Sequence, residues 1–184
     1  MAEEGETMAI VFQYGSNVCT ARINSPKRLK GDARPIEKAQ TVDDYDIAFD
    51  VWSDTNQCAA ADLISIPGHK AWGVLYEISD DLVRGSKADR KTLAQIEGPR
   101  YEEKNIRVRK PNGDIVDAVT YLARPRDRRN DLLTTVWYVS WVLYGLREHC
   151  VPEEYIEHVQ QVAIQTNQRV GGDAQKQIAL IETL

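Results

Sequence analysis

The sequence predicts a single α+β domain in which a mostly antiparallel, curled sheet is flanked by helices. The first half of the chain is rich in short strand-like segments, a helix and two further strands follow, and the last third has helical spacing. The chain has 184 residues, of which 42% are hydrophobic and 28% charged, enough for one domain with its own core. We assign residues 1–7 to a disordered N-terminus, 8–166 to the domain and 167–184 to a C-terminal tail that could be partly helical.

The expected strands are short apolar or alternating runs bounded by turn residues. They cover residues 8–12, 36–42, 45–52, 62–66, 71–76, 104–109 and 115–122. Three turns between them have the composition of hairpin turns: Asp43-Asp44, Pro67-Gly68-His69-Lys70 and Pro111-Asn112-Gly113-Asp114.

The expected helices follow from capping residues and apolar spacing. Ser79 caps a helical stretch that continues to Ile96, with a break near Gly85. Asp131 caps a second helix whose apolar residues recur at helical spacing, and Pro152 starts a third, with acidic residues in its first turn.

The charge pattern argues against nucleic acid and membrane partners. The net charge is −5, the N-terminus is acidic, and the longest apolar stretch, residues 136–146, is far too short to cross a bilayer. The basic run Arg124–Arg129 could contact a phosphate or an acidic partner, but a solvated loop is the commoner explanation of such a run. Cys19, Cys58 and Cys150 match no zinc or redox motif, and we expect reduced thiols in a cytoplasmic protein.

Familiar catalytic motifs are missing from the sequence. It contains no glycine-rich phosphate loop, no His-Glu-x-x-His and no Gly-x-Ser-x-Gly elbow. His69, His149 and His158 do not fall at metal-ligand spacing, so we expect no metal and no cofactor.

Two short segments carry the chemistry that the sequence does offer. Tyr14-Gly15-Ser16-Asn17 is a polar turn after an apolar strand, where consecutive backbone N–H groups can bind a carboxylate or an oxyanion. Glu97 ends a helical stretch before Gly98-Pro99, where apolar neighbours can raise its pKa and suit it to proton transfer. Taken separately, each segment is also explained as an ordinary turn and an ordinary helix-end glutamate.

In combination, these segments resemble the gamma-glutamylcyclotransferase-like family. The resemblance rests on an ordered set of motifs from about Met8 to about Val159: Tyr14–Asn17, the stretch Leu63–Ile78 with its Trp-Gly-Val step, Leu93–Gly98, Tyr121-Leu122, Gly145-Leu146 and Pro152–Tyr155. No single motif is specific, but their common order is.

The resemblance implies a small β-barrel or strongly curled sheet wrapped by helices, with a pocket at its mouth. It implies release of 5-oxoproline from a gamma-glutamyl amino acid or amine, with Glu97 as catalytic residue and no cofactor. It further implies substrate contacts by Tyr14, Gly15, Ser16, Asn17 and Tyr138. Tyr101 and Tyr121 are expected pocket walls, although each of these tyrosines could equally belong to the core.

Two departures from the family pattern leave alternatives open. Ala94 stands where many relatives carry Asp, and Cys58-Ala59-Ala60-Ala61 replaces a glycine-containing start of a strand. A different reaction, such as removal of a gamma-glutamyl group from a specialised metabolite, is one alternative. A non-catalytic binding module is another, because the apolar helix around Trp137 and Trp141 could pair two copies in a homodimer or simply pack in the core.

Overall fold

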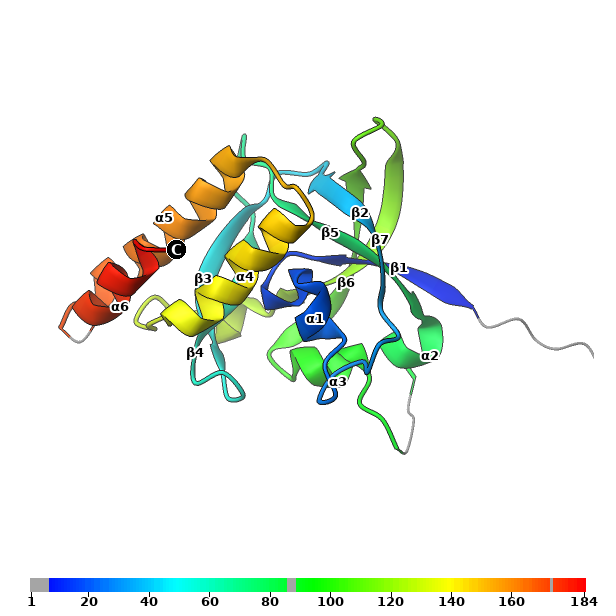
Figure 1. The fold of residues 1–184 in the computed structure, drawn as a ribbon, viewed down its shortest axis with the longest axis horizontal. Helices are drawn as coiled ribbons and strands as arrows, with labels where there is room; N and C mark the ends of the chain where they lie inside the picture. Colours follow the sequence, from blue (N-terminus) through cyan, green and yellow to red (C-terminus); the bar gives the residue numbers. More distant parts are fainter. Residues whose placement is uncertain (1–6, 86–88, 173) are drawn as a thin grey trace, which may run out of the picture.

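The computed structural model describes residues 7–85, 89–172 and 174–184, so the expected disordered N-terminus lies, except for Thr7, outside the described residues. Five strands form the main sheet in the order β1-β5-β2-β6-β7 (Figure 1). Their bounds are β1 Met8–Gln13, β2 Arg34–Thr41, β5 Trp72–Ser79, β6 Tyr101–Arg109 and β7 Ile115–Ala123.

The main sheet curls until its outer strands meet. All neighbours in this order are antiparallel, and β1 also pairs in parallel with β7 through Val11 and Val119. β2 and β6 share only two residue pairs, at Gln40–Arg109 and Thr41–Val108. Because so few residues pair at these two places, the mixed sheet can bend strongly around its core. The predicted α+β class with a curled sheet flanked by helices is therefore confirmed.

A separate two-stranded sheet stands beside the main one. It pairs β3 (Asp46–Ser53) with β4 (Cys58–Ile64), with a bulge between Phe49 and Val51. Two of the three predicted hairpins are wrong for this reason: the turns at 43–44 and 67–70 lead from the main sheet to this hairpin and back again. The third is confirmed, since β6 and β7 pair across 111–114.

Three helices cover one side of the molecule: α4 (Val136–Glu148), α5 (Glu153–Val170) and α6 (Ala174–Ile181), coloured yellow to red in Figure 1. Asp131 does not cap α4, because it forms an ion pair with Arg129; the hydroxyl of Thr135 takes this role by accepting the N–H of Tyr138. The segment 167–184 that we expected as a tail comprises the end of α5 and all of α6.

Short helical elements complete the fold. The helix expected from Ser79 to Ile96 is two short helices instead, α2 (Asp80–Val83) and α3 (Leu93–Glu97). α3 begins at a capping box of Thr92 and Gln95 and ends at Gly98, whose φ of 89° favours glycine. The other short elements are η1 (Ser16–Val18), α1 (Thr20–Ile23) and η2 (Pro125–Asp127).

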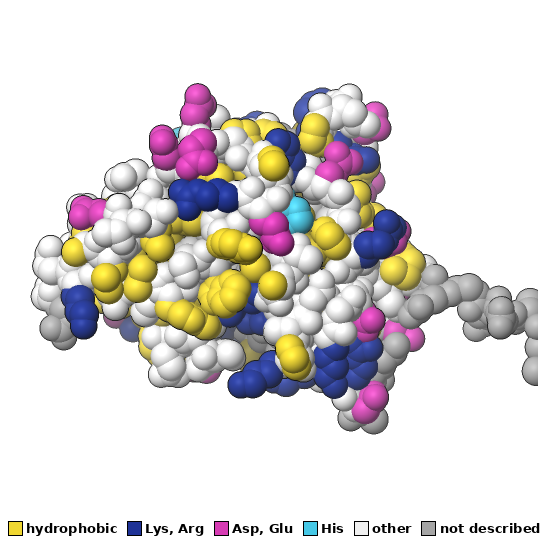
Figure 2. All heavy atoms as spheres, viewed as in Figure 1, with side chains coloured by type: hydrophobic (Ala, Val, Ile, Leu, Met, Phe, Trp, Pro, Cys, Tyr) yellow, Lys and Arg dark blue, Asp and Glu magenta, His cyan; other side chains and the backbone are white. Residues whose placement is uncertain are grey.

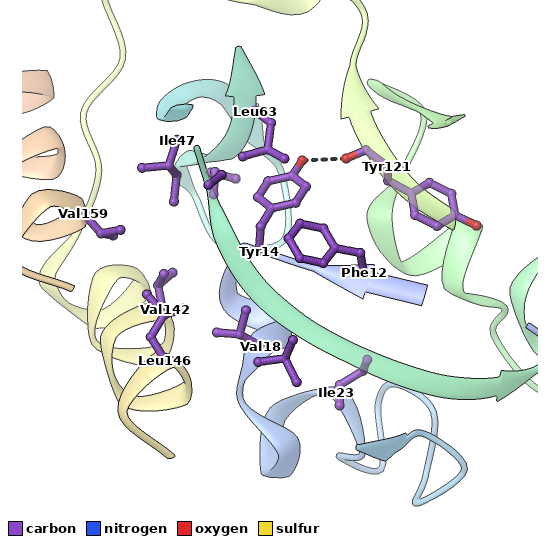
Figure 3. Packing of buried hydrophobic residues seen from close by; sticks show 14 of the residues in the cluster. Phe12, Tyr14, Val18, Ile23, Ile47, Leu63, Tyr121, Val142, Leu146 and Val159 are labelled. Carbon is purple, nitrogen blue, oxygen red and sulfur yellow. Dashed lines mark hydrogen bonds between the residues drawn. The ribbon is translucent and has the colours of Figure 1, made fainter. Parts of the chain in front are cut away.

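The core joins the curled sheet to α4 and to the loop after β1 (Figure 3). Phe12 and Val18 are fully buried. Phe12 lies beside Tyr14 among the strands, whereas Val18 lies toward α4, which contributes Val142 and Leu146 (Figure 3). The outer face of α4 leaves Tyr144 60% exposed, and hydrophobic side chains gather over this helix in Figure 2. Among the described residues, no helix is both long and apolar enough to span a membrane.

Candidate active site

A cavity of about 220 Å³ opens where the loop after β1 meets α3, the start of β6 and the β3–β4 turn. It brings together every residue that the sequence singled out as a substrate contact or proton carrier, from positions up to 124 residues apart (138 − 14). These lining residues are Tyr14, Gly15, Ser16, Asn17, Glu97, Tyr101, Tyr121 and Tyr138. Their roles in catalysis and binding remain predictions, but their common location is a feature of the structure.

Glu97 is held in this cavity by a relay of polar side chains. Its Oε1 accepts a 2.9 Å hydrogen bond from Nδ2 of Asn17. Oδ1 of Asn17 in turn accepts a 2.8 Å bond from Nη1 of Arg28. The amide of Asn17 thus has both of its ends engaged, which fixes the direction in which it presents its N–H group to the carboxylate.

The environment of Glu97 changes its acidity in a direction that suits proton transfer. Burial raises the pKa of the carboxyl above its ordinary value, while the positive charge of Arg28 and the hydrogen bond from Asn17 oppose the rise. The residue is half-buried, and its carboxyl lines the cavity. A carboxyl with a raised pKa can accept a proton and return it within one reaction cycle.

Two of the tyrosines are tied to one residue of β4. The hydroxyl of Tyr138 accepts a 3.1 Å bond from the N–H of Ala61, and the hydroxyl of Tyr101 donates a 2.7 Å bond to its carbonyl. Tyr14 donates a 2.5 Å bond to the carbonyl of Tyr121, joining the loop after β1 to β7 (Figure 3). Each ring therefore forms a wall of the cavity with its hydroxyl already anchored, which makes the walls rigid.

The loop itself is tightly packed at Gly15. A Cβ at this position would lie 3.2 Å from Cβ of Ala61 and 3.4 Å from the hydroxyl of Tyr138, so a larger residue would have to displace β4 or α4. The 3-10 turn η1 begins at the next residue, Ser16, and the carbonyl of Gly15 accepts the N–H of Val18 at 3.0 Å. The first N–H groups of such a turn have no partner within it and face a ligand where one is available.

The cavity is also lined by residues that were not predicted as site residues, and two of them bear on the environment of Glu97. Gln13 is only 5% exposed, lines the cavity, and its Nε2 has no hydrogen-bond partner within the described part of the chain. Its sequence signal was present, since it is a polar residue at the end of an apolar strand. Arg28 had no such signal, because it lies in the irregular segment between α1 and β2 and reaches the cavity only through the fold.

Comparison with solved structures identifies the fold. A structure titled "Gamma-glutamyl cyclotransferase" superposes with a TM-score of 0.73 at 20% identity, over 97% of this chain and 100% of that one. This chain has a gamma-glutamylcyclotransferase-like fold. An uncharacterized protein from Homo sapiens superposes with a TM-score of 0.71 at 22% identity, over 84% of this chain and 88% of that one.

The sequence comparisons agree with this assignment. Residues 70–159 of this chain match the sequence model of the AIG2-like family, which together with the shared fold confirms the predicted resemblance. Among solved structures, YkqA from Bacillus subtilis also superposes, with a TM-score of 0.66 at 20% identity, over 87% of this chain and 55% of its own length. No curated relative matches the sequence.

The two departures from the family pattern occupy different places in this gamma-glutamylcyclotransferase-like fold. Ala94 is exposed on α3 and does not line the cavity. Ala60 and Ala61, from the altered strand start, do line it. The alanine segment therefore bears on the shape of the pocket, whereas position 94 bears on the surface of the helix that supplies Glu97.

Proposed function

We propose that this protein is an enzyme that releases 5-oxoproline from a gamma-glutamyl amino acid or amine in the cytoplasm. The observation that carries the proposal is the shared cavity, in which the Glu97 carboxyl and the Tyr14–Asn17 loop face the same space. The fold supports it, and the three free cysteines, two of them buried, fit a reducing compartment.

The reaction needs no nucleophile from the protein, because the α-amine of the substrate attacks its own γ-carbonyl carbon. Glu97 takes a proton from the α-ammonium group, which is mostly protonated at neutral pH. The new bond joins the α-nitrogen to the γ-carbon, and the bond to the leaving amine breaks as Glu97 returns the proton to it. The attacking nitrogen loses a second proton to solvent on becoming the lactam N–H, and the released amine takes up a proton from solvent to leave as an ammonium ion. Both groups belong to one molecule, so holding the glutamyl chain curled removes part of the entropic barrier, about several kcal/mol.

The other cavity residues then have separate tasks. Backbone N–H groups at Gly15 and Ser16 stabilise the oxyanion, an effect of about 3 kcal/mol per donor. Gln13 supplies a further buried donor: its Nε2 has no hydrogen-bond partner among the described residues, and its side chain lies near enough to Glu97 to lower the pKa of that carboxyl. Tyr101 and Tyr138 enclose the glutamyl chain.

The direct test is a panel of gamma-glutamyl amino acids and gamma-glutamyl amines, with 5-oxoproline measured by chromatography and mass spectrometry. Turnover of about 1 per second or more on simple gamma-glutamyl amino acids would support the proposal and exclude dedication to a specialised metabolite. Absence of 5-oxoproline from every compound, including specialised gamma-glutamyl amides, would overturn it and leave a binding module.

The pH dependence of the reaction should report the ionisation of Glu97. Only the ionised carboxylate accepts the proton, so kcat/KM should fall as the pH drops through its pKa in the folded protein. Because burial raises this pKa, the acidic limb should lie above pH 4.5, the ordinary value for the group. A profile measured on an active substrate that stays flat down to pH 4.5 would contradict this prediction.

Replacing Asn17 with Ala should move that acidic limb further upward. The substitution removes a hydrogen bond that lowers the pKa of Glu97 and leaves Arg28 without its partner at Asn17. We expect a roughly ten-fold loss of kcat/KM at pH 7 together with the shift. Asn105→Ala, at an exposed position on β6, is the control and should change neither kcat/KM at pH 7 nor the position of the acidic limb. A lower rate with an unmoved limb would show that Asn17 does not act through Glu97.

A further inference from the structure

A second group of reactive side chains lies outside the proposed active site. Asp46 at the start of β3, His69 in the turn before β5 and His158 in the middle of α5 converge on one point. Nδ1 of His69 lies 2.9 Å from Oδ2 of Asp46, and Nε2 of His158 lies 2.7 Å from Oδ1. Spacing along the chain does not reveal this group, because its members come from three separate elements.

The donor set suits a particular kind of ion. One ligand atom from each residue can be chosen so that all lie within 4.8 Å of one another. Two imidazole nitrogens and a carboxylate oxygen are the ligands of divalent first-row transition ions such as Zn²⁺. Bonds of about 2.0–2.2 Å to such an ion need ligand atoms somewhat further apart than they are here, so the side chains must spread slightly.

The surroundings hold the carboxylate firmly and leave the imidazoles room to move. The Asp46 side chain is 13% exposed and also accepts the N–H of Ile47, whereas the His69 side chain is 48% exposed and that of His158 38%. The backbone of His69 is anchored on both sides, by Ile66 and Tyr45. A fixed carboxylate with two adjustable imidazoles can close around an ion without disturbing the fold.

The same three residues line a second cavity, of about 720 Å³. Asp50 also lines this cavity, and its Oδ1 is buried with no hydrogen-bond partner among the residues described. An unpaired buried acceptor is costly unless a donor, water or ion reaches it. Three protein ligands would leave open positions on an ion, and this cavity offers space for the water molecules that fill them.

We propose that Asp46, His69 and His158 form a binding site for a divalent transition-metal ion of the Zn²⁺ class, separate from the Glu97 cavity. The ion would connect β3, the turn at 65–70 and α5. Metal binding to the folded chain would therefore raise its resistance to unfolding. The site is independent of the proposed gamma-glutamyl reaction, and its test requires no substrate.

The test is calorimetric titration of the full-length chain with ZnCl₂ after removal of metal with EDTA. All proteins carry Cys150→Ser, because this exposed thiol could bind Zn²⁺ by itself. We expect one ion per chain with a Kd of about 10 μM or tighter, and a rise in Tm of roughly 5 °C at saturating metal. Spectra of the Co²⁺ form should show nitrogen and oxygen ligation without a thiolate band.

Three variants locate the ion: Asp46→Asn, His69→Asn and His158→Gln should each weaken Zn²⁺ binding at least about ten-fold and abolish most of the Tm shift. His149→Gln is the matched control, since this histidine lies elsewhere, bonded to Thr20. His69 is in an exposed turn, so its variant tests the proposal even if Asp46→Asn does not fold. Lack of Zn²⁺ binding at 100 μM, taken as about ten times the expected Kd, would overturn the proposal, as would equal binding by parent and all variants.

Discussion

Glu97→Gln should lower the rate of 5-oxoproline formation by about 100- to 10,000-fold, the range expected when a positioned acid–base group is lost. Glutamine keeps the size of the side chain and an oxygen that can accept the bond from Asn17, but it cannot take a proton from the α-amine. The substrate should still bind, so the loss should appear in kcat rather than in KM. Steady-state kinetics on the best substrate of the panel measures both.

Stability measurements separate this effect from misfolding. The pKa of Glu97 is raised by burial, so its contribution to stability is greatest at low pH, where the carboxyl is protonated, and is lost as the pH rises through the folded pKa. A neutral amide does not pay the free-energy penalty of burying an ionised carboxylate. We therefore expect Glu97→Gln to be at least as stable as the parent at pH 7. Glu157→Gln, at an exposed position on α5, should leave the kinetics unchanged. Equal rates for parent and Glu97→Gln would refute the assigned role.

Gly145→Ala should destabilise the protein by about 2 kcal/mol, although alanine is the better helix former. A Cβ at Gly145 would lie 2.4 Å from the backbone nitrogen of Cys19 and 2.6 Å from Cγ2 of Val18. The gain in helix propensity is about 1 kcal/mol, and it is outweighed because backbone atoms would have to move. Urea unfolding, followed by circular dichroism, gives the difference in free energy directly.

The same substitution should also reduce activity, because α4 packs directly on η1 at this position. Separating them would displace the turn that contains Ser16 and Asn17, and with it the bond to Glu97. Tyr144→Ala is the control, since the neighbouring side chain is 60% exposed and its removal should change the free energy of unfolding by less than about 0.5 kcal/mol. If Gly145→Ala were as stable as the parent, the close approach of α4 to this loop would be wrong.

Local sequence patterns predicted most strands, but they could not predict how the strands pair. The 111–114 turn joins two strands of one sheet, and its hairpin was predicted correctly. The turn at Asp43-Asp44 has similar composition, yet β2 pairs with β5 and β6 while β3 pairs with β4. The residues of a turn predict that the chain changes direction, but not that the two flanking strands pair with each other. Which sheet receives the next strand depends on long-range burial, which a single sequence does not contain.

The candidate site was partly predictable for a similar reason. The Tyr14–Asn17 loop is contiguous, and Glu97 precedes a glycine that ends its helix. Both can therefore be recognised from neighbouring residues in the sequence. Arg28 and the group around Asp46 cannot be recognised in this way, because their partners lie in other segments of the chain. The predicted N-cap of α4 was wrong although Asp131 is a residue type that often caps helices. Asp131 forms an ion pair with Arg129, and Thr135, which directly precedes the helix, caps it instead.

The attachment of two tyrosines to Ala61 has a mechanical consequence. Tyr138 comes from α4 and Tyr101 from β6, yet both hydroxyls form hydrogen bonds with the backbone of the same residue of β4, Ala61. If β4 slides or tilts, the two walls of the cavity move together, and neither can open alone without breaking its bond. Residues 53–56 of the β3–β4 turn also line the cavity, so a shift of this hairpin would move one rim of the cavity together with both tyrosine walls.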